Sequence, residues 1–193
     1  MTKPKLIWLN VSFFLITFLI AIIAVPYRAF THGFDSAEIS FAVICFIYCG
    51  MSITAGYHRL WSHKTYQAHW SLRLIFALGG AFALQNSILH WCSDHRIHHK
   101  HVDNNGVDPY SAKMGFWYSH IGWMLREYQA SRYTDYTNVR DIQKDPIVAW
   151  QHKYYFQLMI LMNVGIPLAF GLWHGNILNS LLLVGFLRLV LSH

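Results

Sequence analysis

The sequence predicts an all-α integral membrane protein with four transmembrane helices arranged as two hairpins. Five apolar stretches occur along the 193 residues, and hydrophobic residues make up 54% of the chain. Charged residues make up only 12%, whereas a soluble domain usually carries about 25%. No internal repeat and no Gly/Ser-rich linker divides the sequence, so we expect a single domain over residues 1–193.

The first apolar stretch, at about residues 6–25, is long enough to cross a bilayer, which needs about 20 residues. It is too long for the apolar core of a cleavable signal peptide, so we expect a transmembrane helix. The other three expected transmembrane helices lie at about residues 39–55, 156–173 and 177–193. The last contains Arg188, which we expect near the cytoplasmic end and paired with an acid or a lipid head group, because an unpaired charge is costly in lipid.

The distribution of charge predicts the orientation of the chain. Lys3 and Lys5 precede the first expected helix, whereas the loop after it has two acids, Asp35 and Glu38, and a single arginine. The polar segment at residues 90–155 carries many Lys and Arg residues, so the positive-inside rule predicts that this segment and the N-terminus face the cytoplasm. The net charge of +6 is scattered beside apolar runs, which favours contact with anionic membrane lipid and no nucleic acid partner.

The apolar stretch at about residues 72–89 is expected to lie at the cytoplasmic interface, as a helix, a broken helix or a segment that dips into the membrane and returns. Its glycine pair, Arg73 and the pair Gln85-Asn86 would be costly in lipid. A full crossing would also separate the histidines before this stretch from those after it. They could not then share one metal site, so the interfacial placement and the metal site stand or fall together.

Two histidine clusters flank this interfacial stretch. His58 and His63 are five residues apart, which is about 140° on an ideal α-helix, so we expect them at a helix end. His95, His98 and His99 occupy positions i, i+3 and i+4, so their imidazoles can share one helical face. Five neutral nitrogen donors suit iron, zinc or copper. Either cluster alone would be weak support for a metal site, because isolated HxxxxH pairs and interfacial histidines are common.

Together, the clusters resemble the first two histidine boxes of the membrane fatty acid desaturases, and most closely those of the Δ9 acyl-CoA desaturase branch. The first box continues into Lys64-Thr65-Tyr66, and the second runs from Asp94 to Lys100. The resemblance extends over essentially the whole chain, through Leu84-Gln85-Asn86, Trp91, Asp108-Pro109, Gly115-Phe116, Ser119-His120-Ile121-Gly122-Trp123 and Phe186-Leu187-Arg188.

The resemblance implies four transmembrane helices under a cytosolic helical cap that holds two iron ions. It implies nine histidine ligands, of which this sequence supplies five: His58, His63, His95, His98 and His99. The other four would follow shortly after His193, in an NxxxH-like segment and a third histidine box. We therefore expect residues 1–193 to be an incomplete desaturase domain that is unstable and inactive on its own.

The resemblance also assigns roles around the metal ions. Three residues match positions that line the acyl tunnel or meet the acyl head group: Gln85, Asn86 and Trp91. Ordinary core packing is the alternative for the tryptophan. Asp94 and Asp108 could orient imidazole N–H groups or be solvated surface acids, and His120 resembles a histidine near the metal site.

The reaction implied is an O₂-dependent removal of two hydrogens from a fatty acyl chain, giving a cis double bond, with Δ9 the expected position. The substrate would be a fatty acyl-CoA or an acyl-lipid. The sequence has no flavin, haem or iron–sulfur motif, so electrons would come from an external donor of the cytochrome b5, ferredoxin or rubredoxin type. Two alternatives stay open: a related membrane di-iron hydroxylase, because the same boxes serve both reactions, and an inactive truncated membrane fragment.

Overall fold

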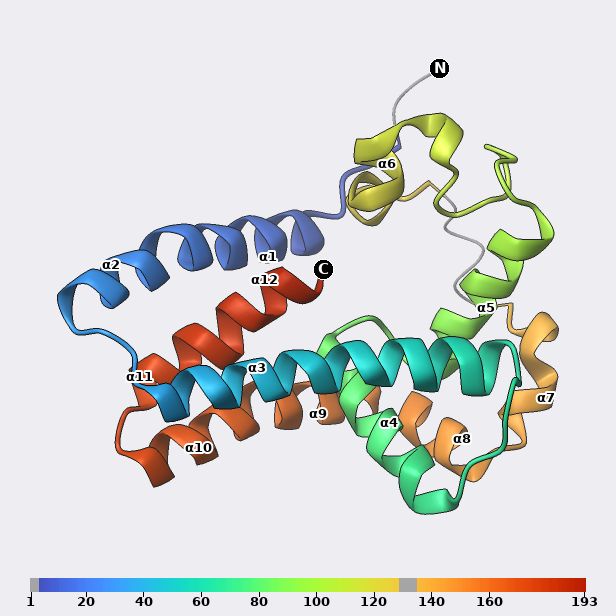
Figure 1. Cartoon of the computed structure of the whole chain (residues 1–193). Helices are drawn as coiled ribbons and strands as arrows, with labels where there is room; N and C mark the ends of the chain where they lie inside the picture. Colours follow the sequence, from blue (N-terminus) through green and yellow to red (C-terminus); the bar gives the residue numbers. More distant parts are fainter. Residues whose placement is uncertain (1–3, 129–134) are drawn as a thin grey trace.

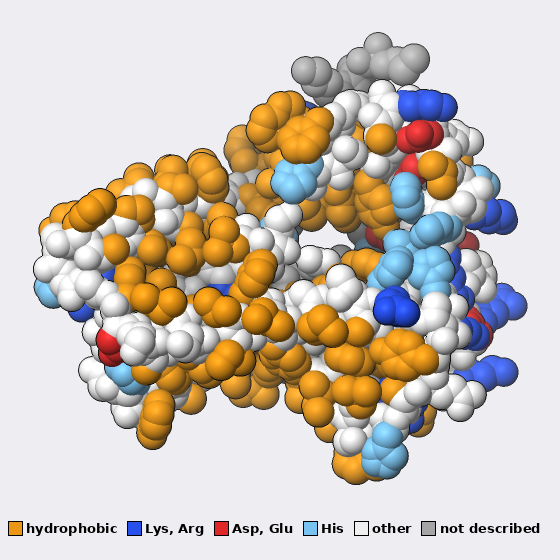
Figure 2. All heavy atoms as spheres, viewed as in Figure 1, with side chains coloured by type: hydrophobic (Ala, Val, Ile, Leu, Met, Phe, Trp, Pro, Cys, Tyr) orange, Lys and Arg blue, Asp and Glu red, His pale blue; other side chains and the backbone are white. Residues whose placement is uncertain are grey.

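The computed structural model describes residues 4–128 and 135–193. All regular secondary-structure elements in these ranges are helices (Figure 1). One isolated antiparallel bridge joins Leu6 to Arg126 within these ranges. Long helices lie side by side over one part of the molecule, and shorter helices gather at its other end. On the face drawn in Figure 2, hydrophobic side chains cover the long helices, whereas charged and histidine side chains concentrate at the end with the short helices.

Two long helices form the first hairpin. The first, Trp8–Thr31, is built from α1 (Trp8–Leu19), the π-helical segment η1 (Ile20–Ala24) and α2 (Val25–Thr31). The second, Ser36–Ser62, is built from α3 (Ser36–Met51) and the π-helix η2 (Ser52–Ser62). Asp35 and Glu38 form a capping box at the start of α3, which satisfies two backbone N–H groups that the first turn leaves without partners.

The second hairpin lies at the C-terminal end of the chain. Its first helix, Tyr155–His174, is built from α9 (Tyr155–Ile160), η7 (Leu161–Gly165) and α10 (Ile166–His174). After the turn at Gly175, its second helix is built from α11 (Ile177–Ser180), η8 (Leu181–Leu187) and α12 (Arg188–Ser192). Among the described residues, three helices are long and apolar enough to cross a membrane: Trp8–Thr31, Ser36–Ser62 and Tyr155–His174. The C-terminal helix Ile177–Ser192 is apolar but shorter than such a span.

The apolar stretch at 72–89 contains a sharp bend. α4 (Trp70–Ala83) ends at Leu84, which adopts the left-handed conformation, and α5 (Ile88–Lys100) begins after Ser87. The Ser87 side chain accepts a hydrogen bond from a backbone N–H in the first turn of α5, as an N-cap does. The axes of α4 and α5 meet at 80°, so the chain makes a nearly perpendicular turn instead of continuing in one direction.

α4 packs against η2 at very short range, and glycine makes this possible. A Cβ atom at Gly79 would lie 2.0 Å from Ser52 Oγ, and one at Gly80 would lie 2.2 Å from the Tyr57 ring. Real Cβ atoms do not come this close to other atoms, so the two helices can approach only where α4 has no side chain.

Shorter helices make up the segment between α5 and the second hairpin: η3 (Ala112–Met114), α6 (Phe116–His120), η4 (Gly122–Met124), η6 (Thr137–Val139), α7 (Arg140–Gln143) and α8 (Pro146–Lys153). Asp141 on α7 ties this segment to α5 through Arg96, whose two Nη atoms lie 2.8 and 3.1 Å from the carboxylate oxygens. Lys64 pairs with the same carboxylate. Burial alone would raise the pKa of Asp141, but the hydrogen bonds and charges of Arg96 and Lys64 hold it well below its ordinary value.

Among the described residues Arg188 pairs with no acid, so the part of the sequence expectation that gave it an acid as partner is wrong. Its side chain is almost fully buried, and its Nη1 donates a hydrogen bond to the Phe82 carbonyl oxygen at 2.6 Å. Nη2 donates to Asn163 Oδ1 at 2.7 Å, and the guanidinium lies 4.0 Å from the centroid of the Phe82 ring. Because α4 ends at Ala83, the Phe82 carbonyl has no partner in its own helix and sits at the negative end of the helix dipole. The helix end thus takes the place of an acid.

The glycines at the α4–η2 contact yield a test of this packing. Gly79→Ala and Gly80→Ala are each expected to lower the free energy of unfolding by about 1–3 kcal/mol, because the new methyl group overpacks the contact. Gly50→Ala is the matched control, since a Cβ there meets no described atom within 4 Å. It is expected to raise stability by about 0.5–1 kcal/mol, because alanine favours the helix over glycine. Unfolding of detergent-solubilised protein followed by circular dichroism measures both effects, and equal stability of all three variants would contradict the packing argument.

Candidate metal centre

The π-helical geometry of η2 determines how His58 and His63 face each other. The backbone N–H of His63 donates to the carbonyl oxygen of His58 at 3.0 Å, which is the i→i+5 hydrogen bond of a π-helix. Residues five apart therefore lie one turn apart, and the two imidazole centroids are 4.5 Å from each other. An α-helix would have separated the two side chains by about 140°. The spacing of His58 and His63 predicted a helix end and not a π-helix, although a five-residue spacing is the one that a π-helix brings to one face.

α5 brings the second pair of histidines to the same place. His95 and His99 are one α-helical turn apart, with their Nε2 atoms separated by 3.1 Å. α5 is anchored to η2 where Cys92 Sγ lies 3.4 Å from the Tyr57 carbonyl oxygen and where Arg96 Nε donates to the Ser62 carbonyl oxygen at 3.1 Å. These contacts hold the face of α5 that carries the two imidazoles against the end of η2.

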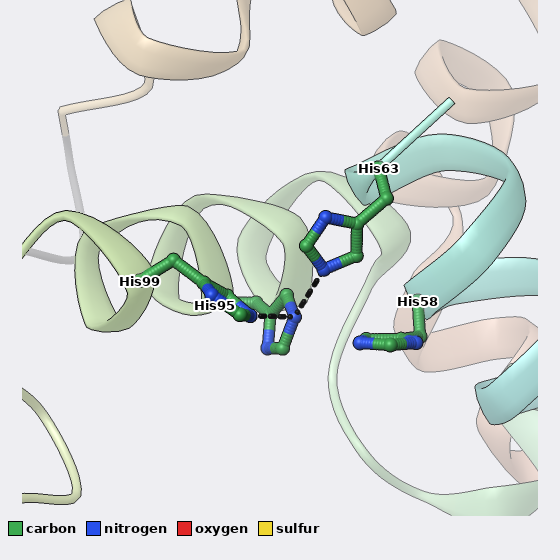
Figure 3. A group of neighbouring side chains, drawn as sticks. All are labelled: His58, His63, His95 and His99. Carbon is green, nitrogen blue, oxygen red and sulfur yellow. Dashed lines mark hydrogen bonds between the residues drawn. The ribbon is translucent and has the colours of Figure 1, made fainter. Parts of the chain in front are cut away.

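Four imidazoles from η2, its C-cap and α5 therefore converge on one small volume (Figure 3). One nitrogen of each of His58, His63, His95 and His99 lies within 4.8 Å of the others. His95 is central, because its Nε2 is 3.0 Å from His63 Nε2 and 3.1 Å from His99 Nε2. Burial, together with the neighbouring imidazoles, lowers the pKa of His95 to about 3. A neutral imidazole at pH 7 keeps a lone pair available, so this donor set fits a transition-metal ion such as iron, zinc or copper.

His98, on the same helix, turns toward Asp108 instead of joining the four. Its Nδ1 lies 2.8 Å from Asp108 Oδ1, and the carboxylate also accepts hydrogen bonds from the backbone N–H groups of Asp103 and Tyr110. Burial would raise the pKa of Asp108, but the bonds from His98 and the two backbone N–H groups hold it below its ordinary value. A carboxylate that accepts the Nδ1 proton fixes the ring and leaves Nε2 as the nitrogen for a metal ion.

The other predicted site residues on α5 lie on either side of the imidazole cluster. Trp91 stacks on the His95 ring, with centroids 4.7 Å apart and planes inclined by 22°. Asp94 is buried, and its Oδ2 lies 3.5 Å from His90 Nε2. The Asp94 carboxylate thus faces a histidine outside the cluster, whereas Asp108 faces His98.

Gln85 and Asn86 lie at the bend between α4 and α5. Gln85 Nε2 donates to the Ser192 carbonyl oxygen at 3.3 Å, and the backbone N–H of Asn86 donates to the Tyr155 hydroxyl at 3.0 Å. His95 follows Asn86 by nine residues, most of them in α5, where the helix advances about 1.5 Å per residue. The structure therefore gives the Gln85 side chain and the Asn86 backbone contacts to the second hairpin, about 10 Å or more along the chain from the imidazoles.

His120 lies in a different part of the molecule from the four imidazoles. Its ring stacks on that of Phe116, with centroids 5.5 Å apart. It also lines an apolar cavity of about 480 Å³ together with Phe14 and Phe18 of α1 and with His193. Among the described residues, neither a hydrogen bond nor a ring contact joins His120 to His58, His63, His95 or His99.

This chain is similar to curated desaturases from fungi and animals. A probable acyl-CoA desaturase of Schizosaccharomyces pombe is 40% identical over 168 residues, which are 86% of this chain and 35% of that protein. The Delta(9)-fatty-acid desaturase fat-7 of Caenorhabditis elegans is 36% identical over 167 residues, or 86% of this chain and 48% of that protein. An acyl-CoA Delta12-desaturase of Acheta domesticus is 36% identical over an alignment of 197 positions, which covers 98% of this chain and 54% of that protein.

The chain spans roughly a third to a half of the length of these relatives. Residues 36–193 match the family model described as fatty acid desaturase. The matched region begins at the first residue of α3 and contains both pairs of converging histidines together with His98 and Asp108. The chain belongs to the fatty acid desaturase family.

Proposed function

We propose that the protein represented by this chain catalyses the oxygen-dependent, di-iron desaturation of a fatty acyl chain, forming a cis double bond, with Δ9 as the proposed position. The convergence of four imidazoles, on a chain that belongs to the fatty acid desaturase family, is the observation that carries this proposal. One relative is named for Δ9 and another for Δ12 at the same identity, so the Δ9 position rests on the resemblance of the histidine boxes.

The five histidines of the two boxes would hold the iron. Four of them, His58, His63, His95 and His99, converge closely enough to bind one ion, and His98 would add its Nε2 from the adjacent turn of α5. Bound iron would supply the O₂-dependent oxidation of an unactivated methylene pair, which no side chain can perform. Asp108 would keep His98 in the orientation and tautomer that a metal ligand needs.

The substrate would approach the irons along apolar and aromatic side chains. Trp91 is proposed to form part of the wall, because its ring lies flat against His95 and edge-on to the rings of Tyr57 and His58. Gln85 and Asn86 are proposed to contact the acyl chain or its head group at the bend before α5. Fatty acyl-CoA is the proposed substrate, since the relatives include acyl-CoA desaturases, with an acyl-lipid as the alternative.

We propose that this protein lies in the membrane with four spans and that a cytosolic helical cap carries the metal site, within a single desaturase domain. Three apolar helices support the spans, and Ile177–Ser192 would be the fourth. The gathering of charged side chains at the end with the short helices supports the cap (Figure 2). Electrons would come from an external donor of the cytochrome b5, ferredoxin or rubredoxin type.

Removal of the central imidazole is expected to weaken metal binding most. His95→Ala should lower the affinity for Fe²⁺ at least tenfold, because His95 Nε2 lies beside both His63 and His99. His101→Ala, one residue beyond α5, is the matched control and should bind as the unchanged chain does. Iron per chain after anaerobic reconstitution is measured by mass spectrometry. Equal iron in both variants, or close to two irons per chain held by residues 1–193, would contradict the ligand assignment.

Neutralising the Asp108 carboxylate, which contacts His98 Nδ1, should weaken metal binding without removing a ligand. Asp108→Asn is expected to lower metal affinity by about 10–100-fold, the usual effect of losing an outer carboxylate partner of a ligating histidine. Asp103→Asn lies in the same loop and serves as the control, because the Asp103 carboxylate accepts a hydrogen bond from the backbone N–H of Ala112 and, within the described part of the chain, is bonded to no histidine. Competition with a coloured chelator gives both affinities, and an equal loss in the two variants would point to loop packing instead.

The reaction itself is tested by the products. A host that expresses the full open reading frame should accumulate cis-monounsaturated acyl chains, and gas chromatography with mass spectrometry fixes the double-bond position. The His95→Ala variant should leave the saturated chains unchanged. Hydroxylated in place of unsaturated chains would favour the related membrane di-iron hydroxylase and overturn the desaturase proposal.

A further inference from the structure

A second group of metal-binding side chains lies at the opposite end of the long helices from the histidine cluster. Asp35 precedes α3, Glu38 lies in its first turn and His174 ends α10. One ligand atom of each residue lies within 4.8 Å of the other two. α3 and η2 together separate this group from His63 by more than about 30 Å at helical rise. The two groups are therefore independent.

Each carboxylate in this group is fixed through one oxygen and presents the other to His174. Asp35 Oδ1 accepts the backbone N–H of Glu38 at 2.9 Å, and Asp35 Oδ2 lies 3.1 Å from His174 Nε2. Glu38 Oε2 accepts two hydrogen bonds, one from the backbone N–H of Asp35 at 3.0 Å and one from Asn179 Nδ2 at 2.9 Å. Asn179 is held in turn by Arg28, whose Nε donates to its Oδ1 at 2.7 Å.

The remaining atoms are buried and lack hydrogen bonds. Glu38 is only 2% exposed, and its Oε1 accepts no hydrogen bond from residues 4–128 or 135–193. His174 Nδ1 is likewise buried without a hydrogen-bond partner in those ranges. The two atoms face each other at 3.8 Å, which is too long for a hydrogen bond. An anionic oxygen and an imidazole nitrogen, buried together without a hydrogen bond between them, form a pair that a bound cation would stabilise.

We propose that Glu38 Oε1 and His174 Nδ1 bind a divalent transition-metal ion of the Zn²⁺ class. Zinc takes carboxylate oxygen and imidazole nitrogen at about 2.0–2.2 Å, so one ion fits between two donors separated by this gap. The imidazole disfavours Mg²⁺ and Ca²⁺, which take oxygen ligands. Asp35 Oδ2 lies 3.1 Å from His174 Nε2, so this carboxylate faces the ring nitrogen opposite Nδ1 and would act as a positioning residue for the imidazole.

The surroundings supply the remaining ligands as water. A cavity of about 340 Å³ opens beside the group and is lined by His32, Gly33 and Asn176 in addition to the residues above. The Asp35 side chain is 53% exposed, so solvent reaches the site from this side. Because Glu38 belongs to α3 and His174 to α10, the bound ion would join the first hairpin to the second at this end of the molecule.

The test is zinc binding by the full chain in detergent, measured by equilibrium dialysis over a range of free Zn²⁺. Glu38→Gln and His174→Gln are each expected to lose one zinc per chain, or to bind it at least tenfold more weakly. Asp35→Asn should weaken the same zinc by about 10–100-fold. Zinc held by the histidine cluster at the far end stays constant across these variants and acts as an internal reference.

Two matched controls separate ligation from general effects. Glu127→Gln removes an exposed carboxylate elsewhere, and His32→Gln removes a histidine that lines the same cavity but whose Nδ1 lies 2.8 Å from the Thr31 hydroxyl. Both should bind zinc as the unchanged chain does. Glu38 also belongs to the capping box, so folding is checked by circular dichroism, and His174→Gln tests the site without touching that box. Unchanged zinc in folded His174→Gln, or equal loss in the controls, would overturn the proposal.

Discussion

Three glycines allow α4 to lie against the π-helical end of the second long helix, where a Cβ at Gly56, Gly79 or Gly80 would come within 2.7 Å of a neighbouring side chain. The contact lies shortly before the end of α4 at Ala83, after which the chain bends at Leu84. α5 then runs back beside η2, so that imidazoles more than thirty positions apart in sequence meet across the two helices. The metal centre depends on this packing more than on any single contact between its histidines.

The buried guanidinium of Arg188 contacts the end of α4 at the same bend. It donates to the Phe82 carbonyl oxygen near the end of α4 and to Asn163 Oδ1 of η7, so one side chain joins both helices of the second hairpin to the bend. A buried charge is tolerated here because each partner is fixed: a carbonyl at a helix end, an amide oxygen and the face of an aromatic ring. These contacts favour one position of α12, because a shift of that helix would leave the buried guanidinium without its hydrogen-bond partners.

Hydropathy and histidine spacing were sufficient to predict the long helices, the interruption near residue 85 and the two histidine clusters. The π-helix of η2 was not predicted, because i→i+5 hydrogen bonds depend on packing against α4 as well as on local sequence. The acid partner expected for Arg188 was wrong for a similar reason: a helix carbonyl is open to a side-chain donor only where its helix ends, and the end of α4 at Ala83 was not predicted. Asp94 and Asp108 were equivalent in sequence, and only the fold separates the acid that faces His98 from the one that faces His90.

The two ends of the molecule use the same local device. At one end Asp108 is held by the backbone N–H groups of Asp103 and Tyr110 and presents an oxygen to His98; at the other, Asp35 is held by a backbone N–H in its capping box and presents an oxygen to His174. A carboxylate fixed by the backbone orients an imidazole before any ion arrives, so little side-chain freedom remains to be lost on binding. At the histidine cluster, the Asp108 carboxylate orients the His98 imidazole beside the four converging imidazoles. At the hairpin tips it accompanies a buried glutamate oxygen that has no donor of its own among the described residues, and that difference is the basis of the proposal that a cation links the hairpins there.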